Sequence, residues 1–203
     1  MKNLNAIVIA AIAACSLQAC HSAKNDSKAA ADSVNETHAM TTDSSKMDTS
    51  SSAMATMTVD KDDAQFATKA ASGGMAEVEL GKIAQKNGSS QKVKDFGTMM
   101  VTDHSKANEE LMALAKSKNI TLPAAPGADE QKNIDDLSKK TGTDFDKAYA
   151  SAMGKDHKTD ISLFEGASKN AKDPDLKAFA TKTLPTLKMH LQAAQAAEAA
   201  VKK

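Results

Sequence analysis

The sequence has no arginine and no tryptophan, and it has only one tyrosine and two cysteines. Its 26 basic residues are therefore all lysines, and 26 acidic residues balance them. Without guanidinium groups or a basic excess, the chain has little with which to clamp phosphates or read bases, which argues against nucleic acid as a partner. It also lacks a glycine-rich phosphate loop and a nucleophile elbow, so the sequence favours a non-enzymatic role.

The first twenty residues predict export and a lipid anchor. Lys2 precedes an apolar run, residues 6–14, that is too short to cross a bilayer. The sequence Leu17-Gln18-Ala19-Cys20 resembles the lipobox of bacterial lipoproteins, in which the cysteine is acylated. We expect residues 1–19 to be a signal peptide and Cys20 to carry the lipid, with ordinary cleavage near Ala19 as the alternative.

A lipidated Cys20 would attach the protein to a membrane of the bacterial cell envelope, and we expect the outer membrane, facing the periplasm. Cys15 lies in the segment that is removed, so the mature chain has no thiol for a disulfide, a metal ligand or a nucleophile. The fold must then be held by its core, and other envelope proteins are the expected partners.

Residues 20–58 contain the lipidated cysteine and a segment rich in serine, threonine and alanine with almost no large aliphatic side chains. Such a segment cannot bury a core, so we expect a disordered tether. Met40, Met47 and Met54 recur every seven residues, close to His38 and Met57, and thioethers with imidazole could capture Cu(I). The solvated tether is the favoured interpretation.

Apolar periodicity predicts helices through the remainder of the chain, residues 59–203. End signals such as Gly88 and Asp173-Pro174 divide it into four long helices and a short one. We expect these helices over residues 60–86, 90–118, 129–140, 144–171 and 174–201. With no strand signal, the fold class is all-α and the architecture is one four-helix bundle. Glycines inside the helices, among them Gly81, Gly97 and Gly154, favour close helix packing.

The segment between the second and third long helices, residues 119–142, bears on the topology. It is much longer than ordinary bundle connections of about 2–8 residues, and it can run the length of the bundle as a crossover containing the short helix. A crossover makes the first and last long helices parallel, whereas an up-down-up-down bundle makes them antiparallel. We expect the crossover.

Four polar side chains interrupt the apolar faces of the long helices: Glu77, His104, His157 and His190. If the first and last long helices are parallel, these side chains lie at one depth in the bundle. They then form either a core network, completed by hydroxyls such as Thr183, or the ligands of one divalent metal ion, Zn, Cu or Fe. Unrelated exposed histidines are the third possibility, and the network is the favoured one. Glu79 lies off the apolar face and is expected to be exposed.

Three aspartates are candidates for orienting the imidazole rings: Asp103, Asp156 and Asp160. Asp103 and Asp156 each precede a histidine directly, which places them about 100° away from it around the helix. That angle weakens their role toward the neighbouring ring.

Nine short motifs support a resemblance to a known family: AEVELG (76–81), VKDF (93–96), MVTDH (100–104), LP (122–123), FDKAY (145–149), DH (156–157), DPDLK (173–177), LP (184–185) and HL (190–191). Together they make residues 60–200 similar to the exported bacterial domain-of-unknown-function family 4142. The resemblance implies a ferritin-like four-helix bundle and supplies no activity.

Di-iron sites of ferritin-like bundles use Glu-x-x-His motifs. Here Val101, Gly154 and Leu187 stand three residues before the histidines, so that motif is absent. The remaining set, three imidazoles and one carboxylate, suits a mononuclear metal centre better.

Two functions follow from this sequence. The favoured one is a lipid-anchored, non-enzymatic envelope domain that binds other envelope proteins through its helical faces. The alternative is a metal-binding ferritin-like protein that buffers a metal or uses it in redox chemistry.

Overall fold

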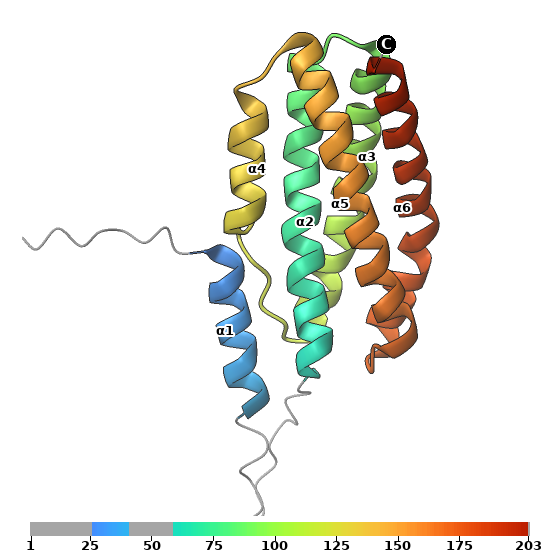
Figure 1. Ribbon diagram of the computed structural model, residues 1–203. Helices are drawn as coiled ribbons and strands as arrows, with labels where there is room; N and C mark the ends of the chain where they lie inside the picture. The colour runs from blue at the N-terminus through green and yellow to red at the C-terminus, as the bar shows by residue number, and fades with distance from the viewer. Residues whose placement is uncertain (1–25, 41–58, 203) are drawn as a thin grey trace, which may run out of the picture.

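The computed structural model of the protein describes residues 26–40 and 59–202 (Figure 1). Over these residues the chain forms six helices and no strand: α1 (Ser27–Met40), α2 (Lys61–Asn87), α3 (Gln91–Ser117), α4 (Ala128–Ser138), α5 (Gly142–Asn170) and α6 (Pro174–Val201). The prediction of an all-α chain with four long helices is confirmed, and each predicted helix end lies within about two residues of the observed one. The expected signal peptide and Cys20 lie outside the described residues.

Local capping explains where two of the long helices begin. The Asp60 side chain accepts a hydrogen bond from the backbone N–H of Asp62 at 3.0 Å, and Asp173 accepts from Asp175 and Leu176 ahead of Pro174. These contacts satisfy N–H groups that have no partner inside the helix. None of the described helices is both long and apolar enough to cross a membrane.

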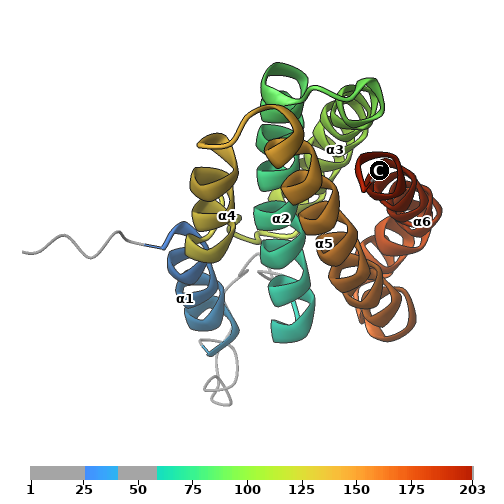
Figure 2. The ribbon, with the colours of Figure 1, turned by 45° about the horizontal axis from the view of Figure 1, so that its top comes forward.

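The four long helices pack as a bundle in which α2 and α6 run in the same direction (Figure 1). The chain ascends α2, descends α3, returns through the connection that contains α4, descends α5 and ascends α6. The predicted crossover between the second and third long helices is therefore present. With the top of the bundle tilted forward, α1 and α4 lie outside the four long helices, and both pack against α2 (Figure 2).

The core divides into two apolar clusters along the bundle axis. One contains Phe66, Leu111, Phe164 and Phe179, and the other contains residues such as Phe145, which is fully buried. On α3, α5 and α6 a buried histidine separates the residues of one cluster from those of the other. A polar layer thus crosses the middle of the bundle.

Two buried aspartates hold the turns between the long helices. Asp146 of α5 accepts hydrogen bonds from the backbone N–H groups of Ser89 and Ser90, in the α2–α3 turn, at 3.0 and 2.8 Å. Asp63 of α2 accepts from the N–H groups of Lys172 and Asp173, in the α5–α6 turn, at 3.0 and 2.6 Å. Each helical hairpin therefore caps the turn of the other, which fixes their relative position along the axis.

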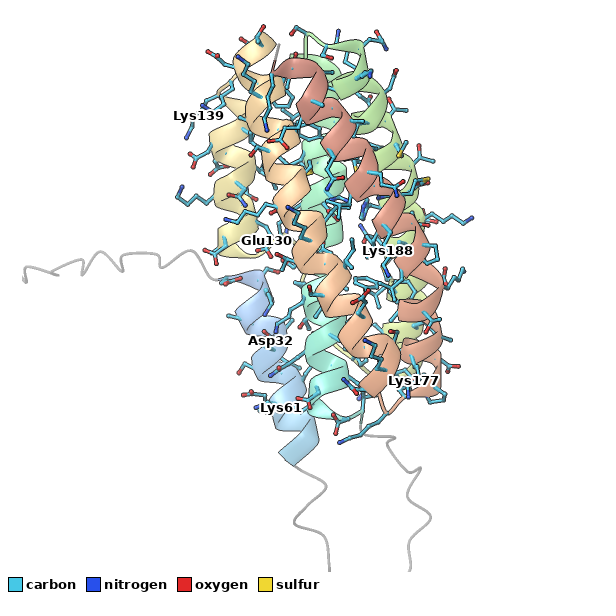
Figure 3. All side chains as sticks on the ribbon, turned by 45° about the vertical axis from the view of Figure 1, so that its right-hand side comes forward. Asp32, Lys61, Glu130, Lys139, Lys177 and Lys188 are labelled. Carbon is cyan, nitrogen blue, oxygen red and sulfur yellow. The ribbon has the colours of Figure 1, made fainter. Side chains whose placement is uncertain are left out.

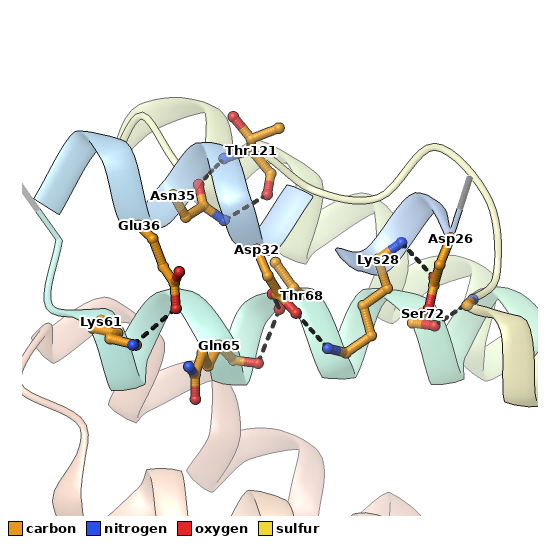
Figure 4. Close-up of polar contacts among 11 residues, drawn as sticks. Asp26, Lys28, Asp32, Asn35, Glu36, Lys61, Gln65, Thr68, Ser72 and Thr121 are labelled. Atoms are coloured by element: carbon orange, nitrogen blue, oxygen red, sulfur yellow. Dashed lines mark hydrogen bonds and ion pairs between the residues drawn. The ribbon is translucent and has the colours of Figure 1, made fainter. Parts of the chain in front are cut away.

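The prediction of a disordered tether is wrong for Ser27–Met40, which form α1 against α2 (Figure 4). This helix is attached mainly by polar contacts. The side chain of Asn35 exchanges two hydrogen bonds with the backbone of Thr121, at 2.9 and 2.8 Å, and Glu36 pairs with Lys61 at 2.8 Å. Ala31 is its one buried apolar residue among the described side chains.

The sequence missed this helix because a search for apolar periodicity cannot detect a helix that docks through side-chain hydrogen bonds. The side chains of the Cu(I) candidates His38, Met40, Met47, Met54 and Met57 lie outside the described part of the chain, so that alternative stays a prediction.

Two glycines allow α2 and α3 to approach closely. A Cβ atom added at Gly97 would lie 2.7 Å from the carbonyl oxygen of Gly81 and 2.8 Å from the Cβ of Ala84. A Cβ at Gly81 would lie 2.7 Å from the carbonyl oxygen of Gly97. The packing explanation holds for this pair, whereas a Cβ at Gly154 of α5 would meet nothing within 4 Å.

Replacing Gly97 by alanine should destabilise the protein by about 1–3 kcal/mol, because the new methyl group must push α2 and α3 apart. The matched change Gly154→Ala should instead stabilise it by about 0.5–1 kcal/mol, since alanine favours the helix and open space receives the methyl group. Urea unfolding of both variants measures this contrast. Equal effects of the two substitutions would contradict a tight α2–α3 contact.

Candidate metal centre

Three imidazole rings meet in the polar layer, each from a different helix. His104 comes from α3, His157 from α5 and His190 from α6, and at most 6% of any of these residues is exposed. Their ring centroids lie 5.1, 5.4 and 5.7 Å apart. The prediction that these three histidines lie at one depth in the bundle is confirmed. The alternative, that they are exposed and unrelated, is wrong.

On each ring, one nitrogen faces an acceptor. Nδ1 of His104 lies 3.0 Å from Oε2 of Glu77, Nδ1 of His157 lies 3.0 Å from the carbonyl oxygen of Met153, and Nε2 of His190 lies 2.8 Å from Oδ2 of Asp103. A proton on that nitrogen satisfies the acceptor in each case, which selects the tautomer of the ring.

The other nitrogen of each ring is left with its lone pair. Nε2 of His104, Nε2 of His157 and Nδ1 of His190 are buried and have no hydrogen-bond partner within the described residues. One nitrogen from each of the three rings lies within 4.8 Å of the others. Three imidazole nitrogens bound about 2.0–2.1 Å from one Zn²⁺ would be roughly 3.3 Å apart, so the rings need to close by at most about 1.5 Å.

Glu77 lies behind the rings rather than among the free nitrogens. Its two carboxylate oxygens lie 3.0 Å from Nδ1 of His104 and 3.4 Å from Nδ1 of His157, the nitrogens that face away from the unpartnered ones. This position favours Glu77 as a group that orients the rings over its predicted role as a fourth ligand. Glu79, two residues further on, is exposed as expected.

None of the three candidate aspartates, Asp103, Asp156 and Asp160, hydrogen-bonds to the histidine nearest to it in the sequence. Asp103 contacts His190, 87 residues away on α6, and not the adjacent His104. An angle of about 100° between neighbours on one helix keeps Asp103 away from His104, but it does not restrict contacts with rings on other helices. Asp160 lies beside Glu77, and Asp156 lies in a neighbouring cleft.

The predicted core network is present in part, because Glu77 pairs with His104 and His157, but the predicted hydroxyl partner is not engaged. The Thr183 hydroxyl donates to the carbonyl oxygen of Phe179 on its own helix, at 2.8 Å, and so is not engaged with an imidazole. Three lone pairs remain without a donor among the described residues. Each unsatisfied buried polar atom costs about 1–3 kcal/mol, so an apo layer of this kind is a sizeable destabilisation.

Burial disfavours the charged forms of the groups in this layer. It lowers the pKa of His104 to about 4, and burial also lowers the pKa of His157 and of His190 below the usual range. Burial raises the pKa of Glu77 to about 7, and burial together with Glu77 raises that of Asp160 well above its usual range. At neutral pH the imidazoles are therefore neutral, which is the form that binds metal ions.

The chain matches the family described as "Domain of unknown function (DUF4142)" over residues 48–197. It belongs to the DUF4142 family. The match includes all of α2 to α5 and every residue of the polar layer in this DUF4142 domain. No curated protein and no solved structure matches the chain.

The pKa values of His104 and Glu77 shift in opposite directions, and this can be tested through the pH dependence of stability in the metal-free DUF4142 protein. Because the folded pKa of His104 is lowered from 6.5 to about 4, its contribution to stability is lost as the pH falls through that window. Because the pKa of Glu77 is raised from 4.5 to about 7, its contribution has the opposite sign: stability is lost as the pH rises. The two effects oppose each other between pH 4.5 and 6.5.

Glu77→Gln removes only the second effect. The unfolding free energy of this variant should therefore fall more steeply on acidification than that of the wild type, by up to about 1.4 kcal/mol per pH unit. Urea unfolding between pH 7 and 4.5 measures the difference, and Glu79→Gln on the exposed face of α2 is the matched control. Parallel pH profiles for Glu77→Gln and the wild type would show that Glu77 is not protonated in the folded state.

Proposed function

We propose that this protein binds one divalent metal ion through His104, His157 and His190. The observation that carries the proposal is the set of three buried, unpartnered ring nitrogens, one from each histidine. In each ring the opposite nitrogen already has an acceptor, so the tautomers suit metal binding before any ion arrives. An ion would give every lone pair a partner and remove the cost of leaving it unsatisfied.

The chemistry of the donors narrows the choice of ion. Three neutral imidazoles and no thiolate suit Zn²⁺, Cu²⁺ or Fe²⁺, and at equal availability Cu²⁺ binds most tightly. Asp103 and Glu77 accept hydrogen bonds from the outer nitrogens of His190 and His104, which increases the basicity of the inner nitrogens. Three protein ligands leave a coordination position open, which suits a metal-buffering or redox role.

We place the domain with ferritin-like bundles, as a mononuclear variant. The parallel α2 and α6 and the long crossover support this placement. The absence of Glu-x-x-His at all three histidines argues against a di-iron centre. The proposal therefore concerns metal binding and not iron storage.

Location in the bacterial envelope is the second part of the proposal. It rests on Leu17-Gln18-Ala19-Cys20 after an apolar run, with Cys20 as the site of lipidation. A helical module that binds other envelope proteins is the alternative function. The side chains of Met112 on α3 and Met189 on α6 support it, because they are 60% and 46% exposed on two helices that pack together.

Metal content of the untagged chain from residue 21, exported to the periplasm, tests the metal site. We expect about one Zn, Cu or Fe per chain by elemental analysis, and a loss of at least tenfold in affinity in His104→Ala, His157→Gln and His190→Gln. Glu79→Gln should retain the metal. Circular dichroism of each variant separates loss of the site from loss of the fold. A folded wild-type protein that takes up none of the three metals would leave the interaction module as the better proposal.

Metabolic labelling with a fatty acid tests the anchor. The full-length chain should incorporate the label and fractionate with outer membranes, while Cys20→Ser should lose both properties because the acyl chains provide the membrane affinity. Labelling that persists in Cys20→Ser would contradict the assignment. The same substitution at Cys15 is the matched control.

A further inference from the structure

A cleft of about 170 Å³ opens between α2, α4 and α5, next to the polar layer. Five carboxyl groups and one carboxamide line it: Glu77, Asp129, Glu130, Asp156, Asp160 and Asn133. In Figure 3, Glu130 lies between the ribbons of α4 and α5. Although lysines and acidic residues are equally numerous in the chain, none of the lysines that the structure describes lines this cleft.

None of the described lysines forms an ion pair with a carboxyl group of the cleft. Lys155 is exposed and does not line the cleft. Its positive charge lowers the pKa of Asp156, but burial has the larger effect and raises that pKa above its usual range. Lys132 and Lys139 of the α4 region both pair with Asp136 instead. Carboxylates gathered in this way repel one another unless a proton or a cation lies between them.

The inner wall of the cleft supplies a second, independent observation. Glu77 is only 4% exposed, and its Oε1 makes no hydrogen bond within the described residues, since Nδ1 of His157 faces it at 3.4 Å. Its other oxygen faces His104, so Glu77 lines the cleft while it orients the metal centre. Asp160 lies beside Glu77 in the lining and hydrogen-bonds to it, so a proton or a cation must lie between these two carboxyl groups.

We propose that this cleft binds a hard divalent cation of the Ca²⁺, Mg²⁺ or Mn²⁺ class through Glu77, Asp156, Asp160 and the acidic residues at the start of α4. Such ions prefer carboxylate and carboxamide oxygens, in contrast to the imidazoles of the other site. Water occupies about 30 Å³ per molecule, so the cleft has room for an ion that keeps several of its waters. The short helix of the crossover, α4, would contribute Asp129, Glu130 and Asn133 to this site.

Calorimetric titration of the chain from residue 21 with Ca²⁺ tests this site, because Ca²⁺ avoids imidazole nitrogen. We expect one ion per chain, with affinity reduced by about tenfold or more in Asp156→Asn and in Glu130→Gln. Asp144→Asn, an exposed aspartate on the same helix as Asp156, should bind as the wild type does. Loss of the free-ion Mn²⁺ signal in electron paramagnetic resonance gives a second measurement on the same variants.

His104→Ala separates the two proposals. It should abolish metal binding by the imidazoles and leave Ca²⁺ binding in place, so failure of one site is distinguishable from failure of the other. Asp156 and Glu130 are partly exposed, so their variants are expected to fold, and circular dichroism verifies it. The proposal is overturned if the folded wild type binds none of the three ions below about 10 mM, or if Asp156→Asn and Glu130→Gln bind as tightly as Asp144→Asn.

Discussion

The rest of the structure depends on the orientation of three imidazole rings, those of His104, His157 and His190. In each ring one nitrogen faces an acceptor, and the other has no hydrogen-bond partner within the described residues. The rings separate the two apolar clusters of the core, and each ring is oriented by a group on its outer side: Glu77, Asp103 or the carbonyl of Met153. An apolar layer at this depth would give a more stable bundle without these requirements. The cost of the polar layer to stability is the reason why we propose that it binds a metal ion.

Convergence of the layer depends on features remote from it. The crossover makes α2 and α6 parallel, so Glu77 and His190 lie at the same depth. Asp63 and Asp146 then cap the turn of the opposite hairpin, which holds the two hairpins in register. A shift of one helical turn, about 5.4 Å, would separate the rings beyond the reach of any single ion. Charged side chains at the ends of the bundle thus set the geometry of its centre.

Much of this arrangement could be predicted from the sequence. Apolar periodicity and capping residues define the five helices from α2 to α6, and the length of residues 119–142 correctly indicated a crossover. Periodicity does not show which side chain on another helix a residue contacts. The sequence could therefore relate Asp103 to its neighbour His104, but not to its actual partner, His190. For the same reason, Glu77 could be placed on the inner face but not on the outer side of the rings. Helix α1 escaped prediction because polar contacts, and not apolar burial, attach it to α2.

The docking of α1 against α2 shortens the segment that separates Cys20 from the folded protein. A free segment of nearly forty residues would allow a separation on the order of 35 Å. With α1 beginning at Ser27, only about six residues separate Cys20 from the folded protein, and fully extended they span about 20 Å. Asp26, at the start of α1, lies close to Gly127, just before the acidic first turn of α4. A lipid on Cys20 would therefore hold the mouth of the acidic cleft near the headgroups, where divalent cations accumulate at anionic lipid surfaces.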